Sequence, residues 1–209
     1  MPREEQVLVI ERKVLEQVGM FQGLTFDVDN YLRKFFVQGV PRFMPRSQVE
    51  ENPAYKQLIP YVLMSYKDKY LSYVRGKRAG ETRLVGHRSI GIGGHINPID
   101  ADNSSLFAYL YDNYLTAVKR EVAEEVSVET SHTDSIVALL NDESNEVGSV
   151  HLGIVHHWVL NAPKVSKREQ MITQMAFMRP AELQEVRDTL ETWSGLCLTQ
   201  LAEMTKNLS

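Results

Sequence analysis

The segment REVAEEVSV, at residues 120–128, decides how this 209-residue chain is interpreted. On a helix, Glu121 lies three and four residues before Glu124 and Glu125, so the three carboxylates converge on one edge. Like charges at this spacing repel each other, whereas a divalent cation removes the repulsion, and oxygen ligands of this kind suit magnesium or manganese. Arg120 can pair with Glu124 and hold its rotamer. The segment therefore predicts a helix that carries a metal site.

A glycine-rich stretch upstream separates this interpretation from its alternative, an ordinary solvated acidic face of a helix. Gly91, Gly93 and Gly94 permit a tight turn whose backbone carbonyls and amides can approach a metal or a phosphate closely. Asn97 and Pro98 continue the turn. A glycine loop that leads into an acidic helix predicts a cradle for a metal-bound diphosphate.

Together, the loop and the helix resemble the signature of the Nudix hydrolase family, which is a glycine, five residues, a glutamate, seven residues, and then Arg-Glu-apolar-any-Glu-Glu-any-Gly-apolar. Gly94 opens the match, and Asp100 stands where the family has glutamate. The other matched positions are Arg120, Glu121, Val122, Glu124, Glu125 and Val128. The chain departs from the signature at Asp100, in the nineteen residues that separate Asp100 from Arg120, and at Ser127. Ser127 replaces a glycine that favours a left-handed backbone.

This resemblance implies an α/β fold, a Nudix-type α/β/α sandwich with a mixed central sheet. It also implies hydrolysis of the diphosphate bond in a nucleoside diphosphate derivative. The implied cofactor is Mg²⁺ or Mn²⁺, with Glu121, Glu124, Glu125 and the Gly93 carbonyl as its ligands. Arg120 is expected to orient the glutamates, and Arg120, Glu121 and Glu124 are expected to be catalytic.

The resemblance also requires a carboxylate that acts as general base. This base is Glu121 itself or a glutamate outside the segment. Glu169, in the loop after a predicted strand, is preferred, and Glu143 and Glu146 are weaker candidates. Three residues are expected to contact the substrate: Arg75, Arg88 and His95. For His95 the alternative is packing within the glycine loop.

The apolar pattern divides the chain into an N-terminal extension, residues 1–53, packed on a main domain, residues 54–209. Proline spacing predicts a loop or linker at 39–53, and acidic composition predicts a loop at 141–149. Strands are expected at 7–14, 58–64, 70–75, 136–140, 150–160 and 175–178. Helices are expected at 28–37, 105–126 and 180–201, the last as one helix or two.

The bulk composition favours a cytoplasmic protein that acts on a small molecule. A net charge of −4 and a pI near 5.9 argue against general binding to a nucleic-acid polymer or a membrane surface. Cys197 is the sole cysteine, which excludes a disulfide framework and predicts a buried core residue. No stretch reads as a secretory signal or a bilayer-spanning segment. Apolar residues in the N-terminal extension favour a homodimer.

Two other functions stay open at this level. The altered Asp100 and Ser127 and the lengthened signature favour a non-catalytic Nudix-fold module that binds a nucleotide or a protein. The other hypothesis is that the protein is a Nudix-like isomerase of an isoprenoid diphosphate. Its reactive cysteine has no evident counterpart here, because Cys197 lies far downstream in an apolar segment.

Overall fold

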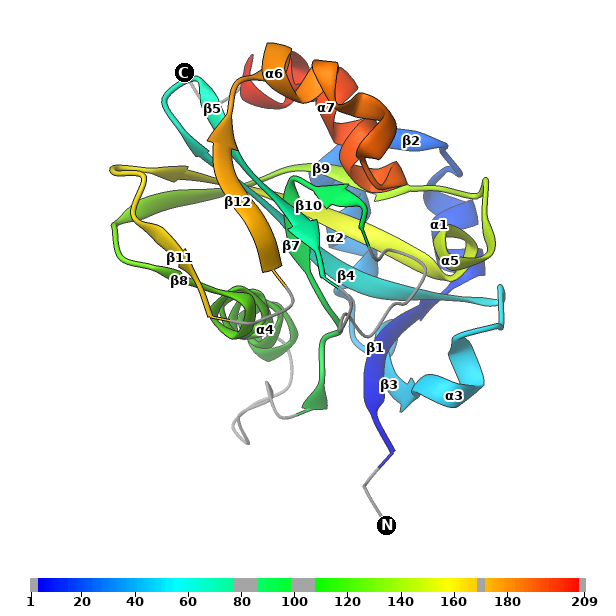
Figure 1. Cartoon of the computed structure of the whole chain (residues 1–209). Coiled ribbons are helices and arrows are strands. Elements are labelled where there is room, and N and C mark those ends of the chain that lie inside the picture. The colour runs from blue at the N-terminus through cyan, green and yellow to red at the C-terminus, as the bar shows by residue number, and fades with distance from the viewer. Residues whose placement is uncertain (1–3, 77–85, 99–107, 169–171, 207–209) are drawn as a thin grey trace. The chain divides into compact units, whose positions relative to one another are not determined.

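The structure, a computed structural model, describes residues 4–76, 86–98, 108–168 and 172–206 (Figure 1). The chain forms two compact units, and each is described by itself. The first unit comprises Met1–Pro60, Gly94–Arg120 and Ala138–Ile154. The second unit comprises Tyr61–Gly93, Glu121–Val137 and Val155–Ser209. The division expected between residues 53 and 54 stays a prediction.

Several elements of the described chain have residues in both units. They are β4 (Tyr55–Tyr66), α4 (Ala108–Glu125), β9 (His132–Asn141) and β10 (His151–Leu160). Every residue of β4 from Lys56 to Ser65 is buried, a continuous pattern typical of a strand that is covered on both faces. Along α4, Tyr114, Val118 and Val122 are buried, as their four-residue recurrence predicts.

The first unit is built on short antiparallel pairings. β1 (Gln6–Glu11) pairs with β3 (Arg42–Pro45) and with the beginning of β4. β2 (Gly23–Thr25) pairs with the end of β9. Its helices are α1 (Arg12–Val18), α2 (Val28–Phe35), α3 (Arg46–Val49) and α5 (Glu146–Val150). Val7, Val9 and Val49 form a buried cluster that holds α3 against β1.

The second unit contains the glycine strand β7 (Gly91–Gly93), which pairs antiparallel with β4. β4 and β5 (Lys69–Arg75) form the expected hairpin, with Ser65 opposite Tyr70. The other strands are β6 (Arg88–Ser89), β8 (Val126–Val128), β11 (Val165–Lys167) and β12 (Ile172–Met178). The helices are α6 (Pro180–Glu185), a short 3-10 turn (Arg187–Thr189) and α7 (Thr192–Thr205). Cys197, on α7, is fully buried, as expected.

Within the described residues, the hydrogen-bonded strands of the main sheet follow the order β12-β5-β4-β10-β9-β2. β1, β6 and β7 pair onto this path, β3 pairs with β1, and β8 and β11 form a separate two-stranded sheet. Strands that alternate with helices around a large sheet confirm the α/β class. None of the helices in the described part of the chain combines the length and the apolar character that crossing a membrane requires.

Two segments expected to be loops contain regular structure, so those predictions were wrong. In the proline-rich stretch, β3 ends at Pro45, where a missing N–H interrupts no ladder, and α3 begins at the next residue. In the acidic stretch, α5 begins after Asn145, whose side chain accepts a hydrogen bond of 2.8 Å from the Gly148 amide. A side-chain cap of this kind stabilises the start of a short polar helix. The spacing of apolar residues does not reveal such a helix.

A substitution at Gly91 tests how tightly β7 is packed. A Cβ atom at Gly91 would lie 2.2 Å from Cζ of Tyr61, a buried ring that cannot move away cheaply. We expect Gly91→Ala to lower the free energy of unfolding by roughly 2 kcal/mol or more in urea denaturation.

Gly195→Ala is the matched control, because a Cβ atom there meets nothing within 4 Å and Gly195 lies inside α7. It should be neutral or stabilise the protein by up to about 1 kcal/mol. A Gly91→Ala variant as stable as the wild type would contradict this account of the strand.

Candidate active site

The three glutamates of the signature stand at the C-terminal end of α4. Glu121 and Glu125 are half-buried and Glu124 is exposed. The last turn of the helix contains no basic residue. Because the C-terminal end of a helix carries partial negative charge, acidic side chains are least favourable there. A bound cation would remove both the mutual repulsion and the unfavourable interaction with the helix.

Tyr73, on β5, links the glycine strand to the last of these glutamates. Its hydroxyl lies 3.0 Å from the Gly91 carbonyl and 3.4 Å from Oε2 of Glu125, so one proton serves both oxygens. Burial, reinforced by the charge of Glu125, raises the pKa of Tyr73, and the phenol therefore stays a donor. The glycine strand and the acidic end of α4 thus meet at one buried hydroxyl.

The chain leaves α4 without the turn that the Nudix signature provides. β8 begins directly after Glu125, and Ser127 pairs with Ser166 in an extended conformation. The φ angle of Ser127 is not positive, so a glycine is not needed at this position. Arg168 closes the helix end, because its amide donates to the Glu125 carbonyl (3.0 Å) and its Nη1 to the Ala123 carbonyl (2.7 Å).

Arg120 and His95 come together in the first unit. Nη2 of Arg120 donates to the His95 carbonyl at 3.0 Å, which fastens the segment after the glycines to α4. The pairing of Arg120 with Glu124 that the sequence suggested stays a prediction.

The His95 side chain belongs to a group that sequence reasoning missed. Among the residues that the structure describes, only Glu50, His95 and His151 form a set of three metal-ligating side chains with ligand atoms within 4.8 Å of one another. The carboxylates of the signature are not gathered that closely in the described chain. Glu50 and His151 are distant from His95 in sequence, and no motif or spacing marks them.

The two predicted substrate-binding arginines contact protein groups in the second unit. Nε of Arg75 lies 3.0 Å from Oε2 of Glu191, which is buried and also accepts from Ser89 at 2.6 Å through Oε1. Arg88 donates to Ser72 Oγ at 3.2 Å and to Gln174 Oε1 at 3.3 Å. Their contacts with substrate stay predictions.

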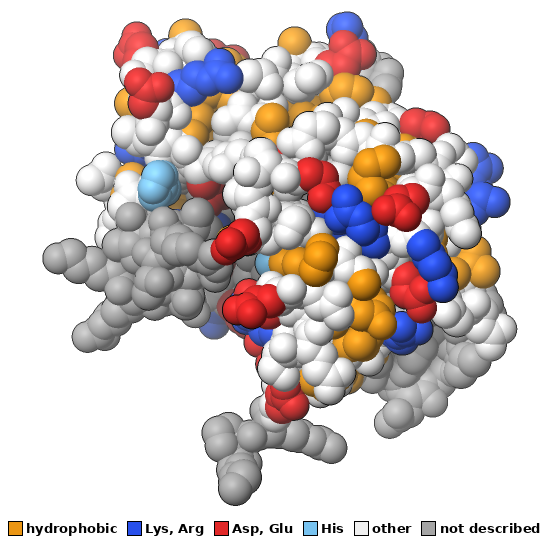
Figure 2. All heavy atoms as spheres, turned by 90° about the vertical axis from the view of Figure 1, so that its right-hand side faces the viewer, with side chains coloured by type: hydrophobic (Ala, Val, Ile, Leu, Met, Phe, Trp, Pro, Cys, Tyr) orange, Lys and Arg blue, Asp and Glu red, His pale blue; other side chains and the backbone are white. Residues whose placement is uncertain are grey.

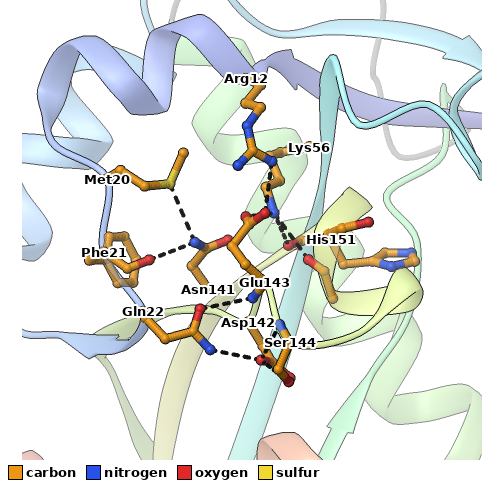
Figure 3. A network of polar contacts seen from close by, with 12 residues as sticks. Arg12, Met20, Phe21, Gln22, Lys56, Asn141, Asp142, Glu143, Ser144 and His151 are labelled. Atoms are coloured by element: carbon orange, nitrogen blue, oxygen red, sulfur yellow. Dashed lines mark hydrogen bonds and ion pairs between the residues drawn. The ribbon is translucent and has the colours of Figure 1, made fainter.

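The remaining candidates are of two kinds. Glu169, the preferred general base, and Asp100 lie outside the described residues. Glu143 forms ion pairs with the buried amine of Lys56 and with Arg12, so its carboxylate is occupied in structural contacts (Figure 3). Glu146, the first residue of α5, is exposed.

Removal of the Tyr73 hydroxyl tests whether Glu125 is a metal ligand positioned from β5. Groups that orient metal ligands contribute about 10- to 100-fold in affinity. We expect Tyr73→Phe to weaken Mn²⁺ binding about 10-fold, measured by the loss of the free-ion signal in electron paramagnetic resonance.

Tyr66→Phe, which removes a hydroxyl from the end of β4, should leave Mn²⁺ affinity unchanged. Equal affinities for the wild type and Tyr73→Phe would show that Tyr73 does not position a metal ligand.

Comparison with known proteins gives relatives over nearly the whole chain. The sequence is 32% identical over 200 residues to protein YmaB of Bacillus subtilis (strain 168), covering 91% of this chain and 94% of that protein. The crystal structure of Tm1382, a proposed Nudix hydrolase, superposes with a TM-score of 0.76 at 25% identity over 96% of this chain and 99% of its own. No protein-family model matches the sequence.

A more distant structure shares the fold. The Nudix domain of NrtR from Shewanella oneidensis, solved with ADP-ribose, superposes with a TM-score of 0.50 at 14% identity. That match covers 73% of this chain and 88% of the NrtR domain.

Proposed function

We propose, since the chain belongs to the Nudix hydrolase family, that it is a divalent-metal-dependent pyrophosphohydrolase of a nucleoside diphosphate derivative. Nudix hydrolases act on acid anhydrides. The observation that carries the proposal is the meeting of the acidic end of α4 with the glycine strand β7 at Tyr73. ADP-ribose, the ligand of the NrtR domain, indicates the chemical class of substrate with which to begin.

The residues of this site fit Mg²⁺ or Mn²⁺ as the cofactor. Glu121, Glu124, Glu125 and the Gly93 carbonyl offer only oxygen atoms, the ligands that such hard cations prefer. When bound, the cation neutralises the diphosphate and lowers the pKa of a water molecule. Tyr73 holds the Glu125 carboxylate beside the glycine strand.

A carboxylate must then accept the proton of the attacking water. Glu121, half-buried on α4, is the candidate within the described residues, and Glu169 is the other. Arg120 would keep the segment that follows the glycine strand in register with the helix through the His95 carbonyl. Arg75 and Arg88 would contact the substrate phosphates.

The substrate is proposed to be a small molecule. On the face shown in Figure 2, Lys and Arg side chains lie beside Asp and Glu, so no basic stripe forms there. In the first unit, Arg12 pairs with both Glu16 and Glu143. A nucleic-acid backbone needs clustered positive charge. The cytoplasmic location and the homodimer stay predictions.

The structure weakens one argument for the alternative hypothesis that the protein is a non-catalytic binding module. That reading rested partly on Ser127, which lies in an extended strand where glycine has no advantage. The two remaining departures, Asp100 and the lengthened signature, fall in or beside residues outside the described ranges.

The test is release of nucleotide or phosphate from a panel of nucleoside diphosphate derivatives, including ADP-ribose, with Mg²⁺ or Mn²⁺. We expect Glu124→Gln to lower kcat/KM by at least about 100-fold, because it removes a charged metal ligand without changing the size of the side chain.

Glu129→Gln is the matched control, an identical change at an exposed glutamate beyond the helix, and it should leave kcat/KM unchanged. Wild-type activity in Glu124→Gln, or no release from any member of the panel, would refute the proposed function.

A further inference from the structure

We infer that Glu50, His95 and His151 form a second metal site, which takes a divalent transition-metal ion and fits Zn²⁺ best. One ligand atom from each side chain lies within 4.8 Å of the other two. Nε2 of His95 and Nε2 of His151 are 3.4 Å apart. Two imidazole nitrogens bound to a tetrahedral zinc ion, at about 2.0–2.1 Å each, are separated by about 3.4 Å. The two rings therefore already stand at the spacing of a chelating pair.

The protonation state of His151 leaves the correct nitrogen for a metal. Nδ1 lies 2.7 Å from the Val147 carbonyl, which can only accept, so Nδ1 carries the proton. The neutral ring then presents a lone pair at Nε2, the atom that faces His95. A carbonyl that binds the distal N–H of a ligating histidine is the usual support of a metal-bound imidazole.

Glu50 is in a form that binds metal, whereas His95 needs one proton shift. In the hydrogen bond to the bare Nε2 of His151, Nε2 of His95 carries the proton, which must move to Nδ1 before Nε2 can bind a metal. Burial, with contributions from Arg46 and His151, lowers the pKa of His95 to about 3, so its ring is neutral at physiological pH. Arg46 donates to both oxygens of Glu50, at 2.9 and 3.3 Å, and thereby lowers the pKa of Glu50. Each carboxylate oxygen accepts one of these bonds and keeps a lone pair.

The charge around the site suits a cation although a guanidinium is present. Arg46 also contacts Glu5 at 3.1 Å, so its positive charge is shared between two carboxylates. Glu5, Arg46 and Glu50 together carry one net negative charge. With two neutral imidazoles, this charge is available to stabilise a divalent ion.

The scaffold positions the ligands through contacts that do not involve a metal. Glu50 follows α3, and the amide of Leu8 on β1 donates to the Ile96 carbonyl beside His95 at 3.0 Å. The buried amine of Lys56 donates to the Gly148 carbonyl at 3.0 Å and contacts the His151 carbonyl at 3.5 Å. Figure 3 shows the His151 carbonyl facing Lys56 and its imidazole pointing away from this network.

The chemistry of the donors distinguishes this site from the acidic end of α4. Two imidazole nitrogens and one carboxylate select zinc and related ions over magnesium, whereas the signature offers oxygen alone. Three protein ligands leave a fourth position on zinc for water or a substrate oxygen. The inference does not rest on the proposed hydrolase activity, because it predicts metal binding in the protein alone.

The experiment is titration of chelator-treated full-length protein with Zn²⁺, and separately with Co²⁺, in an excess of Mg²⁺ that occupies oxygen-only sites. We expect one equivalent of either ion to bind. Bound Co²⁺ should show the visible absorption bands of a low-symmetry site with nitrogen ligands. His95→Gln and His151→Gln, which keep polar side chains of similar size, should each weaken Zn²⁺ binding by at least about 100-fold.

Two control variants keep the outcome interpretable. His87→Ala, at an exposed histidine, and Glu124→Gln, in the signature, should both retain wild-type Zn²⁺ affinity. Circular dichroism verifies that each variant is folded; if His151→Gln does not fold, His95→Gln and Glu50→Gln give the same readout. Zn²⁺ affinity that is unchanged in His95→Gln, or lost in Glu124→Gln, would overturn the inference and leave His95 and His151 as a hydrogen-bonded pair.

Discussion

The carboxylates of Glu121, Glu124 and Glu125 stand at the C-terminal end of α4, where the aligned peptide dipoles place partial negative charge. Backbone and side-chain donors compensate part of this charge: Arg168 covers the last carbonyls, and the Tyr73 hydroxyl lies against Glu125. A divalent ion bound by these carboxylates, as proposed, would lower the energy of acidic side chains at this position.

A rigid support behind the glycine strand gives this site its geometry. The Tyr61 ring fills the space that a side chain at Gly91 would need. Its hydroxyl is fixed by Glu191 at 3.0 Å and by Ser194 at 2.7 Å, and Ser194 also accepts from the Ile90 amide at 3.0 Å. The beginning of α7 thus holds β7 in place. A backbone carbonyl can serve as a metal ligand only if its strand is held in this way.

Local pattern was sufficient to predict the parts of the chain where one periodicity dominates. The sequence predicted three such features: the apolar residues that recur every four positions along α4, the hairpin around Lys67, and the apolar run in β4. The signature identified the acidic helix end because its spacing is set by local helix geometry. Ser127 looked like a defect only because a strand in place of a turn was not foreseen.

The missed features depend on contacts between segments distant in sequence. α3 forms after Pro45 because Val49 packs on β1, which no local count of prolines reveals. Glu50 and His151 meet His95 only through the pairing of strands and through Lys56, whose amine reaches across to α5. Single histidines and glutamates without a spacing motif carry no local signal of a shared site.

The most direct test of the metal cradle is anomalous diffraction from crystals soaked with Mn²⁺ and a non-hydrolysable nucleoside diphosphate analogue. The account predicts a manganese ion about 2 Å from carboxylate oxygens of at least two of Glu121, Glu124 and Glu125, next to the Gly93 carbonyl. Carboxylates of α4 directed into solvent, with manganese bound elsewhere or not at all, would contradict it.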